Sequence, residues 1–245
     1  MDKLGTIARG KPAGYDQEIV KRRSRLTAQR VALEGKLVLD FGCGNGAQTV
    51  QFAPSRCRLT AVDVEPRNLA VLQTYLRQHD LHHIYPLLYD GERLPFPDRC
   101  FDAVLSFEVL EHVSSETGTL QELHRVLKPG GDLVLSVPNK GWLFETHGAH
   151  LPLLPWHRVP FFSWLPPAVH RRYARARIYR KRDIINILEA NGFDVVSAAY
   201  VTAPMDVVHN DTLQHLLRTY LFKKDVTPCT FMSTSILVHS RKAEH

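Results

Sequence analysis

The feature that most constrains the fold of this chain is a glycine-rich turn that directly follows a short apolar run. Residues 36–41 (Lys-Leu-Val-Leu-Asp-Phe) lead into the sequence Gly-Cys-Gly-Asn-Gly at 42–46. An apolar run of this length is typical of a strand buried inside a parallel sheet. Glycines after such a strand let the backbone approach a ligand closely, and a helix that follows presents unpaired amide groups. The turn therefore predicts an α/β fold with a ligand site at the end of its first strand.

Strand and helix patterns alternate along the rest of the chain. The expected strands are 57–63, 83–88, 101–107, 131–137, 193–201 and 231–238, and the expected helices are 47–53, 66–79, 116–127 and 181–191. Alternation of this kind implies crossover connections, because a hairpin cannot join parallel strands. The sequence therefore predicts a Rossmann-like, doubly wound α/β fold, with a mostly parallel seven-stranded sheet and helices on both faces.

Two segments stand outside this alternation. Residues 1–35 are polar and basic with apolar residues at helical spacing, which predicts an N-terminal helical lid on a domain that covers 36–245. Residues 140–180 follow the fifth strand and are too interrupted by proline to form a buried helix. Ligands in this kind of fold bind outside the carboxyl ends of the strands. We therefore expect 140–180 to be a cap insertion over the substrate.

Composition excludes several classes of protein. With 44% hydrophobic and 23% charged residues, the chain can bury a core, unlike a disordered or fibrous protein. No apolar run approaches the roughly 18 residues of a membrane-spanning helix. The first residues lack the apolar stretch of a signal peptide, and the cysteines lie far apart without a CxxC pair. These features predict a cytoplasmic protein with reduced thiols.

Positive charge gathers in one basic, aromatic-interleaved run at 170–182. Such a run suits RNA, an anionic membrane surface or a phosphorylated substrate, and a solvated helix face is the plain structural alternative. The segment before it is apolar and aromatic. Together they lead to the hypothesis of peripheral contact with the inner membrane surface through 151–182.

Two carboxylates decide between the ligands that a glycine turn can hold. Asp63 ends the second strand about 20 residues after the first glycine, where a carboxylate accepts hydrogen bonds from a ribose diol. Gly42, Gly44 and Ala47 also satisfy the dinucleotide-binding fingerprint. However, Asp40 directly precedes the turn, where it would repel a pyrophosphate and attract a cation. S-adenosylmethionine, which carries a sulfonium and an ammonium group, therefore fits better than a dinucleotide.

Four stretches in this order resemble the motifs of the class I S-adenosylmethionine-dependent methyltransferases. They are VLDFGCGNG at 38–46, DGERLPFPD at 90–98 with FDAV at 101–104, SFEVLEHV at 106–113, and LHRVLKPGG at 123–131. The resemblance is to the small-molecule branch of this class that includes enzymes of ubiquinone biosynthesis. It implies S-adenosylmethionine as the cofactor and S-adenosylhomocysteine as the product.

The resemblance also implies which residues bind the cofactor. The methionine part would lie against Asp40, Gly42, Gly44 and Gly46, and the ribose would be held by Asp63. The adenine would contact Val64, Asp90 and Gly91, and Phe107 would lie near the transferred methyl group. For each, an ordinary structural role is the alternative: a turn glycine, a capping aspartate or a core phenylalanine. In the lid, Tyr15 and Arg25 are further candidates for contacting the cofactor.

The candidate catalytic residues lie mainly in the third motif. If 108–113 is helical, Glu108, Glu111 and His112 share one face at the pocket mouth. His112 would then serve as a general base. Alternatively, the three residues would hold a divalent metal, as a similar E-x-x-E-H run does in ubiquinone-pathway O-methyltransferases, or they would simply end a turn. His147, which opens the irregular segment with His150, is a further candidate.

These features together predict transfer of a methyl group to a small, hydrophobic or lipid-linked acceptor, with O-methylation favoured and in-line displacement as the reaction. Two alternatives stay open. One is an RNA methyltransferase that uses the basic run at 170–182, although the chain has no appended RNA-binding motif. The other is a non-catalytic S-adenosylmethionine-binding module, which the intact cofactor motifs disfavour.

Overall fold

The computed structural model describes residues 12–143, 161–165, 176–208 and 210–243. The strands of this part of the chain are β1 (Leu37–Phe41), β2 (Arg58–Asp63), β3 (Ile84–Leu88), β4 (Phe101–Phe107), β5 (Leu127–Pro138), β6 (Phe193–Thr202), β7 (Val226–Thr227) and β8 (Ser233–Lys242). Its α-helices are α1 (Glu18–Ala28), α2 (Pro66–Gln78), α3 (Glu116–Val126), α5 (Lys181–Glu189) and α6 (Asp211–Leu216). Short 3₁₀ turns are η1 (Thr49–Ser55), η2 (Leu110–His112), η3 (Phe162–Trp164) and η5 (Thr230–Met232), and η4 (Leu217–Leu221) is a π-helical turn that continues α6.

All the described strands belong to one sheet, in the order β3-β2-β1-β4-β5-β8-β6-β7. β1 to β5 run parallel, and β8 lies antiparallel between β5 and β6. The predicted Rossmann-like, mostly parallel α/β sheet is thus confirmed, but with eight strands and not seven. The additional strand, β7, has only two residues, which pair with Tyr200 and Val201 at the edge of the sheet. A strand this short leaves no alternating pattern in the sequence.

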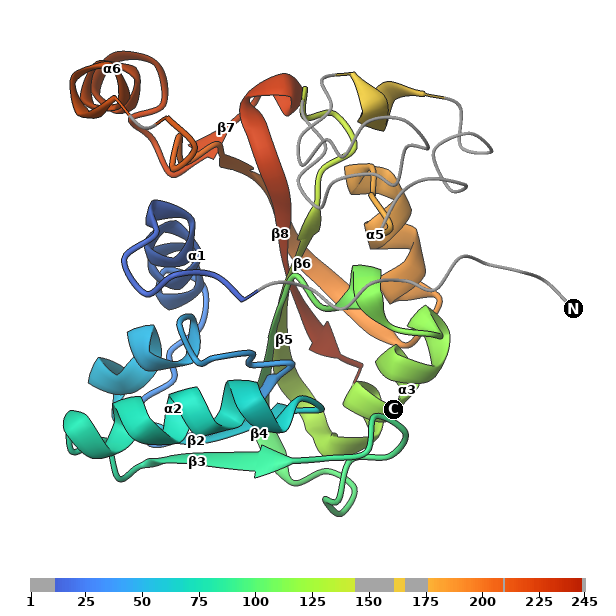
Figure 1. Cartoon of the computed structure of the whole chain (residues 1–245). Coiled ribbons are helices and arrows are strands. Elements are labelled where there is room, and N and C mark those ends of the chain that lie inside the picture. Colours follow the sequence, from blue (N-terminus) through green and yellow to red (C-terminus); the bar gives the residue numbers. More distant parts are fainter. Residues whose placement is uncertain (1–11, 144–160, 166–175, 209, 244–245) are drawn as a thin grey trace, which may run out of the picture.

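Helices cover both faces of the sheet, with α1 and α2 on one face and α3 and α5 on the other (Figure 1). Each face has its own core, because successive strand residues point to opposite sides. Val38 of β1 packs with the leucines of α2, whereas its neighbour Leu39 packs with those of α3 and α5. Burial of each such leucine stabilises the fold by roughly 1.5–3 kcal/mol, so both helical layers are held firmly on the sheet.

The helix boundaries follow local chemistry. Pro66 occupies the first turn of α2, where its missing amide hydrogen costs nothing. The side chain of Ser115 caps α3 by accepting a hydrogen bond from the Gly118 amide at 3.1 Å. Where a helix is predicted at 47–53, the structure has the 3₁₀ turn η1, and this turn contains Pro54. Proline cannot donate the backbone hydrogen bond that an α-helix needs there.

Several expectations fall partly or wholly outside the described residues. The cap predicted at 140–180 is described only at 140–143, 161–165 and 176–180, and the lid predicted at 1–35 only from residue 12 onward. Both remain predictions. In the described ranges, no helix is both long enough and apolar enough to span a bilayer.

Candidate active site

A cavity of about 1010 Å³ opens at the carboxyl ends of β1, β2 and β4. One part of its wall comes from the glycine turn after β1 and from the residues that follow β2 and β3. The other part comes from α1, from the turn after β4 and from the start of α3. The cavity therefore lies where the topology of an open α/β sheet places ligands.

The glycine turn at the cavity packs so closely on its neighbours that Gly42 has no room for a side chain. Gly42 has a φ of +73°, and a Cβ atom on it would lie 2.5 Å from Cγ2 of Val109. The amides of Gly42 and Cys43 both donate to the carbonyl of Val62, which fixes the turn against β2. Gly42 and Gly44 line the cavity, as predicted for contact with a ligand.

Gly46, the third glycine of the turn, lies apart from the other two. It is not among the cavity-lining residues, and a Cβ on it would overlap the side chain of Leu72 in α2. Close packing of the turn against α2 therefore requires a glycine at this position, and the contact of Gly46 with the cofactor stays a prediction.

Asp40 lines the cavity from beneath, although the residue is only 1% exposed. Burial and, to a smaller extent, the nearby charge of Asp63 raise the pKa of its carboxyl to about 7, despite a 2.6 Å hydrogen bond from the hydroxyl of Thr49. A buried carboxyl in this state gains most from a cationic ligand, which would stabilise its ionised form. The residues here therefore fit a ligand with an ammonium or a sulfonium group.

Asp63 joins the glycine turn to the end of β2. Its Oδ2 accepts a hydrogen bond from the Gly44 amide, and its Oδ1 accepts one from the Glu65 amide, both at 2.8 Å. These bonds fix the orientation of the carboxylate at the cavity wall, with Val64 next to it in the lining. The arrangement suits the ribose contact that we predict for Asp63.

Asp90 lies differently from the prediction. Its side chain is exposed and is not part of the cavity wall, and its Oδ1 accepts hydrogen bonds from the amides of Glu92 and Arg93. Asp90 thus caps the turn, whereas Gly91 and Glu92 line the cavity. Tyr89, which sequence reasoning missed, lines it too, and burial is the main cause that raises the pKa of its hydroxyl to about 12.

The part of the wall formed by α1 and the turn after β4 carries a largely buried ion pair that the sequence did not reveal. Nη2 of Arg23 in α1 lies 2.8 Å from Oε1 of Glu108, and the hydroxyl of Ser136 donates to the same oxygen at 2.9 Å. Arg23 is only 7% exposed, yet both Arg23 and Glu108 line the cavity. The only signal for Arg23 was its place on the buried side of α1, in register with Val20 and Leu26.

Glu108 is held in an unusual backbone conformation, with a φ of +57°. A non-glycine residue in this region costs on the order of 1–3 kcal/mol and persists only where its surroundings enforce it. Here the amide of Glu108 donates to the carbonyl of Ser136 at 3.0 Å, and Arg23 holds the side chain. Because of this conformation, Glu108 does not continue the helical backbone of the turn at Leu110–His112.

The predicted shared face of Glu108, Glu111 and His112 does not form. Only Leu110–His112 are helical, as one 3₁₀ turn, so Glu108 lies outside the turn that carries Glu111 and His112. His112 lines the cavity with Glu108, but Glu111 points into the protein and is fully buried. Burial raises the pKa of the Glu111 carboxyl well above its usual range, and the charge of Glu108 adds to this. Oε1 of Glu111 lies 3.9 Å from Nε2 of His112.

The metal alternative finds no support in the described part of the chain. There, no three His, Cys, Asp or Glu side chains converge on a point where a metal ion could be held. Moreover, the carboxylate of Glu108, which would be the first ligand of such a site, is paired with a guanidinium.

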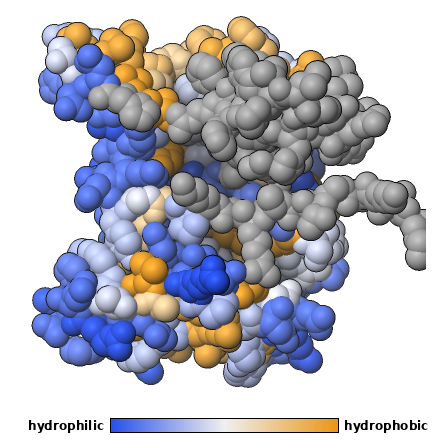
Figure 2. Space-filling view, viewed as in Figure 1, coloured by the Kyte–Doolittle hydropathy of each residue, from blue (hydrophilic) through white to orange (hydrophobic). Residues whose placement is uncertain are grey.

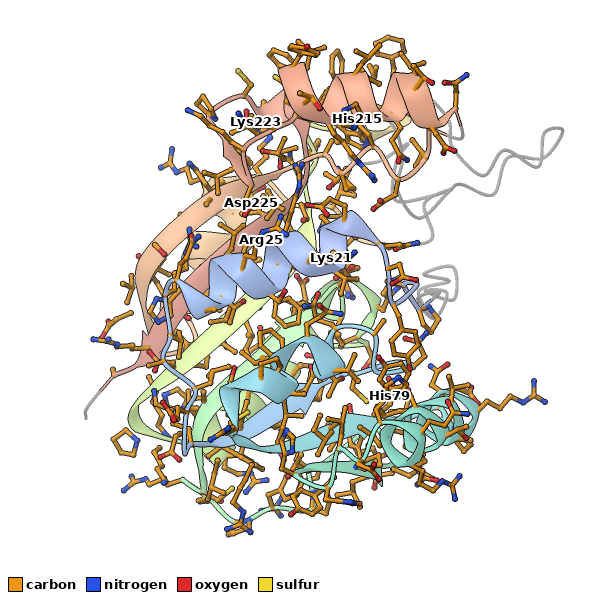
Figure 3. All side chains as sticks on the ribbon, turned by 90° about the vertical axis from the view of Figure 1, so that its left-hand side faces the viewer. Lys21, Arg25, His79, His215, Lys223 and Asp225 are labelled. Atoms are coloured by element: carbon orange, nitrogen blue, oxygen red, sulfur yellow. The ribbon has the colours of Figure 1, made fainter. Side chains whose placement is uncertain are left out.

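Phe107, at the end of β4, lines the cavity as predicted and stacks on Phe52 of η1, with their ring centroids 6.0 Å apart. The hydroxyl of Tyr15 donates to the carbonyl of Asn45 in the glycine turn at 2.5 Å, so the N-terminal segment contacts the cofactor motif. Arg25 does not. It pairs with Asp225 at 2.6 Å on the outer side of α1 (Figure 3).

The candidate His147 and residues 170–175 of the basic run lie outside the described residues. In the described part of the run, Arg177 has a structural role. It donates to the carbonyls of Leu110, Val113 and Ser114 and pairs with Glu116. Arg177 thus holds η2 in place beside the cavity, which leaves less of the run available for RNA.

Comparison with known proteins places these features in a family. A model of the methyltransferase domain matches residues 39–135. A ubiquinone biosynthesis O-methyltransferase from Pseudomonas aeruginosa is 30% identical over 164 residues, which cover 65% of this chain and 71% of the relative. A protein of the same name from Pseudomonas fluorescens is 30% identical over 194 residues, which cover 77% of this chain and 81% of the relative.

Solved structures share the fold at lower identity. An S-adenosylmethionine-dependent methyltransferase from Mesorhizobium loti matches with a TM-score of 0.63 and 19% identity, covering 94% of this chain and 100% of the other. The [4+2]-cyclase SpnF also matches with a TM-score of 0.63, at 21% identity, covering 91% of this chain and 82% of the other. Because a cyclase shares this fold, the fold alone does not define the reaction.

The sheet and its cavity define a Rossmann-like α/β protein with a ligand site at the carboxyl ends of its strands. The sequence relatives then name the class. The chain belongs to the class I S-adenosylmethionine-dependent methyltransferases. It is an enzyme, and S-adenosylmethionine is its cofactor.

Proposed function

We propose that this enzyme methylates an oxygen atom of a small, hydrophobic or lipid-linked acceptor. The proposal rests on one observation: the cavity beside the glycine turn is also lined by apolar and polar side chains from α1 and from the turn after β4. Its volume of about 1010 Å³ leaves room beside a cofactor for a second molecule. The relatives named for ubiquinone biosynthesis support an acceptor of this kind.

The glycine side of the cavity would hold the cofactor. When bound, S-adenosylmethionine supplies a methyl group that its sulfonium already activates for displacement. Asp40 would face the positive charge of the methionine part, and Gly42 and Gly44 would allow close approach of the backbone. Asp63, oriented by two backbone amides, would accept hydrogen bonds from the ribose. The proposed contact of Asp90 with adenine is replaced by Gly91, since only the glycine lies on the wall.

The part of the cavity formed by α1, the turn after β4 and the start of α3 would hold the acceptor. Phe107, Val109 and Val113 give this part of the wall an apolar character that suits a hydrophobic molecule. Arg23 and Glu108 form its polar end, and their ion pair can orient a hydroxyl by hydrogen bonding. Orientation of two reactants can supply about 7–11 kcal/mol of a barrier, so these residues would be the main contributors to rate.

His112 would remove the proton from the acceptor hydroxyl. His112 is one of the residues that line the cavity, and imidazoles exchange protons near neutral pH. The proton would pass from the acceptor oxygen to the imidazole as the oxygen becomes nucleophilic. Glu111, buried behind His112, would restrict the position of the ring.

A pair of acceptors tests the proposal. A catechol with a prenyl tail and the same catechol without it would each be incubated with the enzyme and S-adenosylmethionine, with S-adenosylhomocysteine as the readout. We expect turnover of both, with a higher kcat/KM for the prenylated catechol. His112→Gln should lower kcat by about 100-fold while cofactor affinity is kept, and His82→Gln, at an exposed histidine after α2, should change neither. Turnover of amine acceptors alone would contradict the proposal.

A further inference from the structure

A helical arm projects from the end of the molecule that lies farthest from β3 (Figure 1). The arm consists of α6 and η4, residues 211–221. Its polar side chains contact the rest of the protein. The amide of Gln214 donates to the carbonyls of Met205 and Val208, at 3.0 and 2.9 Å. Arg218 donates to the carbonyl of Pro204 at 2.8 Å and pairs with Asp206 at 2.6 Å. The arm is therefore fixed to the body through its polar residues.

The apolar side of the same arm faces outward. Leu213, Leu216, Tyr220 and Leu221 are 49%, 46%, 76% and 61% exposed. Their spacing puts them on one face of the helix. Hydrophobic side chains gather at this end of the molecule in Figure 2 (upper left). A surface helix normally buries its apolar face and exposes its polar one, so this reversed orientation indicates that the arm docks on something apolar.

A second apolar group lies at the same end of the molecule, at residues 161–165 (Figure 1). Phe161 and Trp164 are 55% and 53% exposed, and their rings meet edge to face with centroids 5.3 Å apart. Tryptophan and tyrosine are the residues that proteins place at the boundary between water and lipid. Two separate apolar groups at one end of a molecule suit a broad, flat surface better than a single compact partner.

Charge at the arm is also suited to one kind of surface. Lys223 and Lys224 follow η4 and are exposed. The acidic residues beside them are engaged within the protein, because Asp206 pairs with Arg218 and Asp225 pairs with Arg25. Asp211, at the far end of the arm, is the exposed acid of this helix. The lysines thus present positive charge next to the apolar face, as a contact with anionic lipid requires.

We propose that the helical arm and the 161–165 turn dock this enzyme onto the surface of an anionic membrane. A second copy of the chain fits less well. Four partly exposed side chains on three helical turns offer a few hundred Å², whereas a stable interface buries about 800 Å² on each partner. The proposal stands apart from the nature of the acceptor, since it concerns a surface and not the cavity.

Asp206 links the arm to the start of α1, which contributes to the cavity wall. Asp206, which pairs with Arg218 of the arm, also accepts hydrogen bonds from the amides of Glu18 and Ile19 at the start of α1, at 3.1 and 3.3 Å. The next turn of α1 carries Arg23 of the cavity wall. Docking of the arm would therefore hold this wall of the cavity close to the lipid surface.

Flotation of the full chain with vesicles tests the proposal. Vesicles of phosphatidylcholine alone would be compared with vesicles of phosphatidylcholine and phosphatidylglycerol in equal parts. We expect binding to the anionic vesicles, and a loss of about tenfold or more in the double variant Leu216→Ser/Tyr220→Ser. The matched control, Val71→Ser/Tyr85→Ser, removes side chains that are each 50% exposed at the other end of the molecule and should bind like the unmodified chain. Lys223→Gln/Lys224→Gln should weaken binding to the anionic vesicles only.

Binding of S-adenosylhomocysteine, measured by calorimetry on each variant, shows that the variants are folded and reports on the cofactor site separately. Absence of binding to both kinds of vesicle would overturn the proposal. Equal loss in the arm variant and in the Val71→Ser/Tyr85→Ser control would overturn it as well. So would a dimer in analytical ultracentrifugation that Leu216→Ser/Tyr220→Ser converts to a monomer, because the arm would then be a contact between two copies.

Discussion

The guanidinium of Arg23 lies 2.8 Å from the carboxylate of Glu108, and both side chains line the same cavity from different elements. Arg23 comes from α1, and Glu108 is the strained residue that follows β4. The pair brings the N-terminal helix into the active site. Arg23 also supplies the positive charge beside Glu108, the carboxylate for which the sequence left a metal ion open as a partner.

Removal of Arg23 should therefore impair catalysis more than cofactor binding. Arg23→Ala leaves a mostly buried carboxylate without its cation, so Glu108 is expected to move. A displacement of about 1 Å can cost on the order of 100-fold in rate, and we expect a loss of kcat/KM of this size. Arg23→Lys should recover part of it. Arg25→Ala on the outer side of α1 is the control, and it should change the free energy of unfolding by less than about 1 kcal/mol. Equal kcat/KM in Arg23→Ala and Arg25→Ala would exclude a role for the ion pair.

Gly42→Ala should be more damaging than the same change at Gly35. Both glycines have a positive φ, of +73° and +69°, so each substitution carries the same backbone cost of roughly 1–2 kcal/mol. A Cβ on Gly35 meets nothing within 4 Å, whereas one on Gly42 meets Val109. The clash should add about 1–3 kcal/mol to the loss of unfolding free energy, as urea titration would measure. Similar losses in the two variants would mean that the turn has more room than its geometry indicates.

Cofactor affinity should depend on pH through Asp40. Burial raises the pKa of its carboxyl to about 7 in the ligand-free protein, so the group is protonated below that pH. A cationic ligand favours the ionised form, so affinity should rise as the pH increases through 7, by up to about tenfold between pH 6 and pH 8. Binding at the lower pH should also release a proton, which calorimetry in buffers of different ionisation enthalpy detects. Asp40→Asn should abolish both effects. Affinity that does not vary with pH in the unmodified enzyme would refute this assignment.

A second carboxyl, far from the site, should govern acid stability. Burial alone would raise the pKa of Asp132, but hydrogen bonds from His239 and Lys36 outweigh it and lower the pKa to about 2. Because the folded-state pKa lies below the unfolded value, the stabilisation is present above about pH 4 and is lost as the pH falls towards 2.

Asp132→Asn should therefore lower the free energy of unfolding by about 1–2 kcal/mol at pH 7, and the difference from the unmodified chain should shrink at pH 3. Asp98→Asn, the control, removes the exposed partner of Arg125 and should change the free energy of unfolding much less than Asp132→Asn does. A difference between Asp132→Asn and the unmodified chain that stays constant down to pH 3 would contradict the assigned pKa.

Much of the fold could be predicted from local pattern. The apolar run at 36–41 predicted β1 to within one residue, because a strand buried on both faces is mostly apolar at consecutive positions. The arm at 211–221 could not be predicted in the same way. Its apolar residues face outward and its polar residues attach it to the body, so the pattern lacks the usual relation to a core.

The site could be predicted where it depends on consecutive residues, and not where it depends on tertiary contacts. The glycine turn and Asp63 follow directly from their places after β1 and β2. The side chain of Glu111 could not be placed in this way. Its direction depends on the backbone at Glu108, whose positive φ prevents Glu108, Glu111 and His112 from forming one continuous helix. Arg23 could be assigned no partner, because its contact with Glu108 exists only once α1 packs across the sheet.

The most direct test of the account is the heat of binding of S-adenosylhomocysteine, measured by calorimetry on the unmodified chain and on Asp63→Ala and Asp63→Asn. We predict saturable binding at one site, a loss of affinity of about tenfold or more in Asp63→Ala, and a smaller loss in Asp63→Asn, which keeps one oxygen for the Gly44 amide. Asp211→Ala, an exposed carboxylate on the arm, should bind like the unmodified chain. No heat with the unmodified chain, or equal affinity in Asp63→Ala, would contradict the placement of the cofactor between the glycine turn and the end of β2.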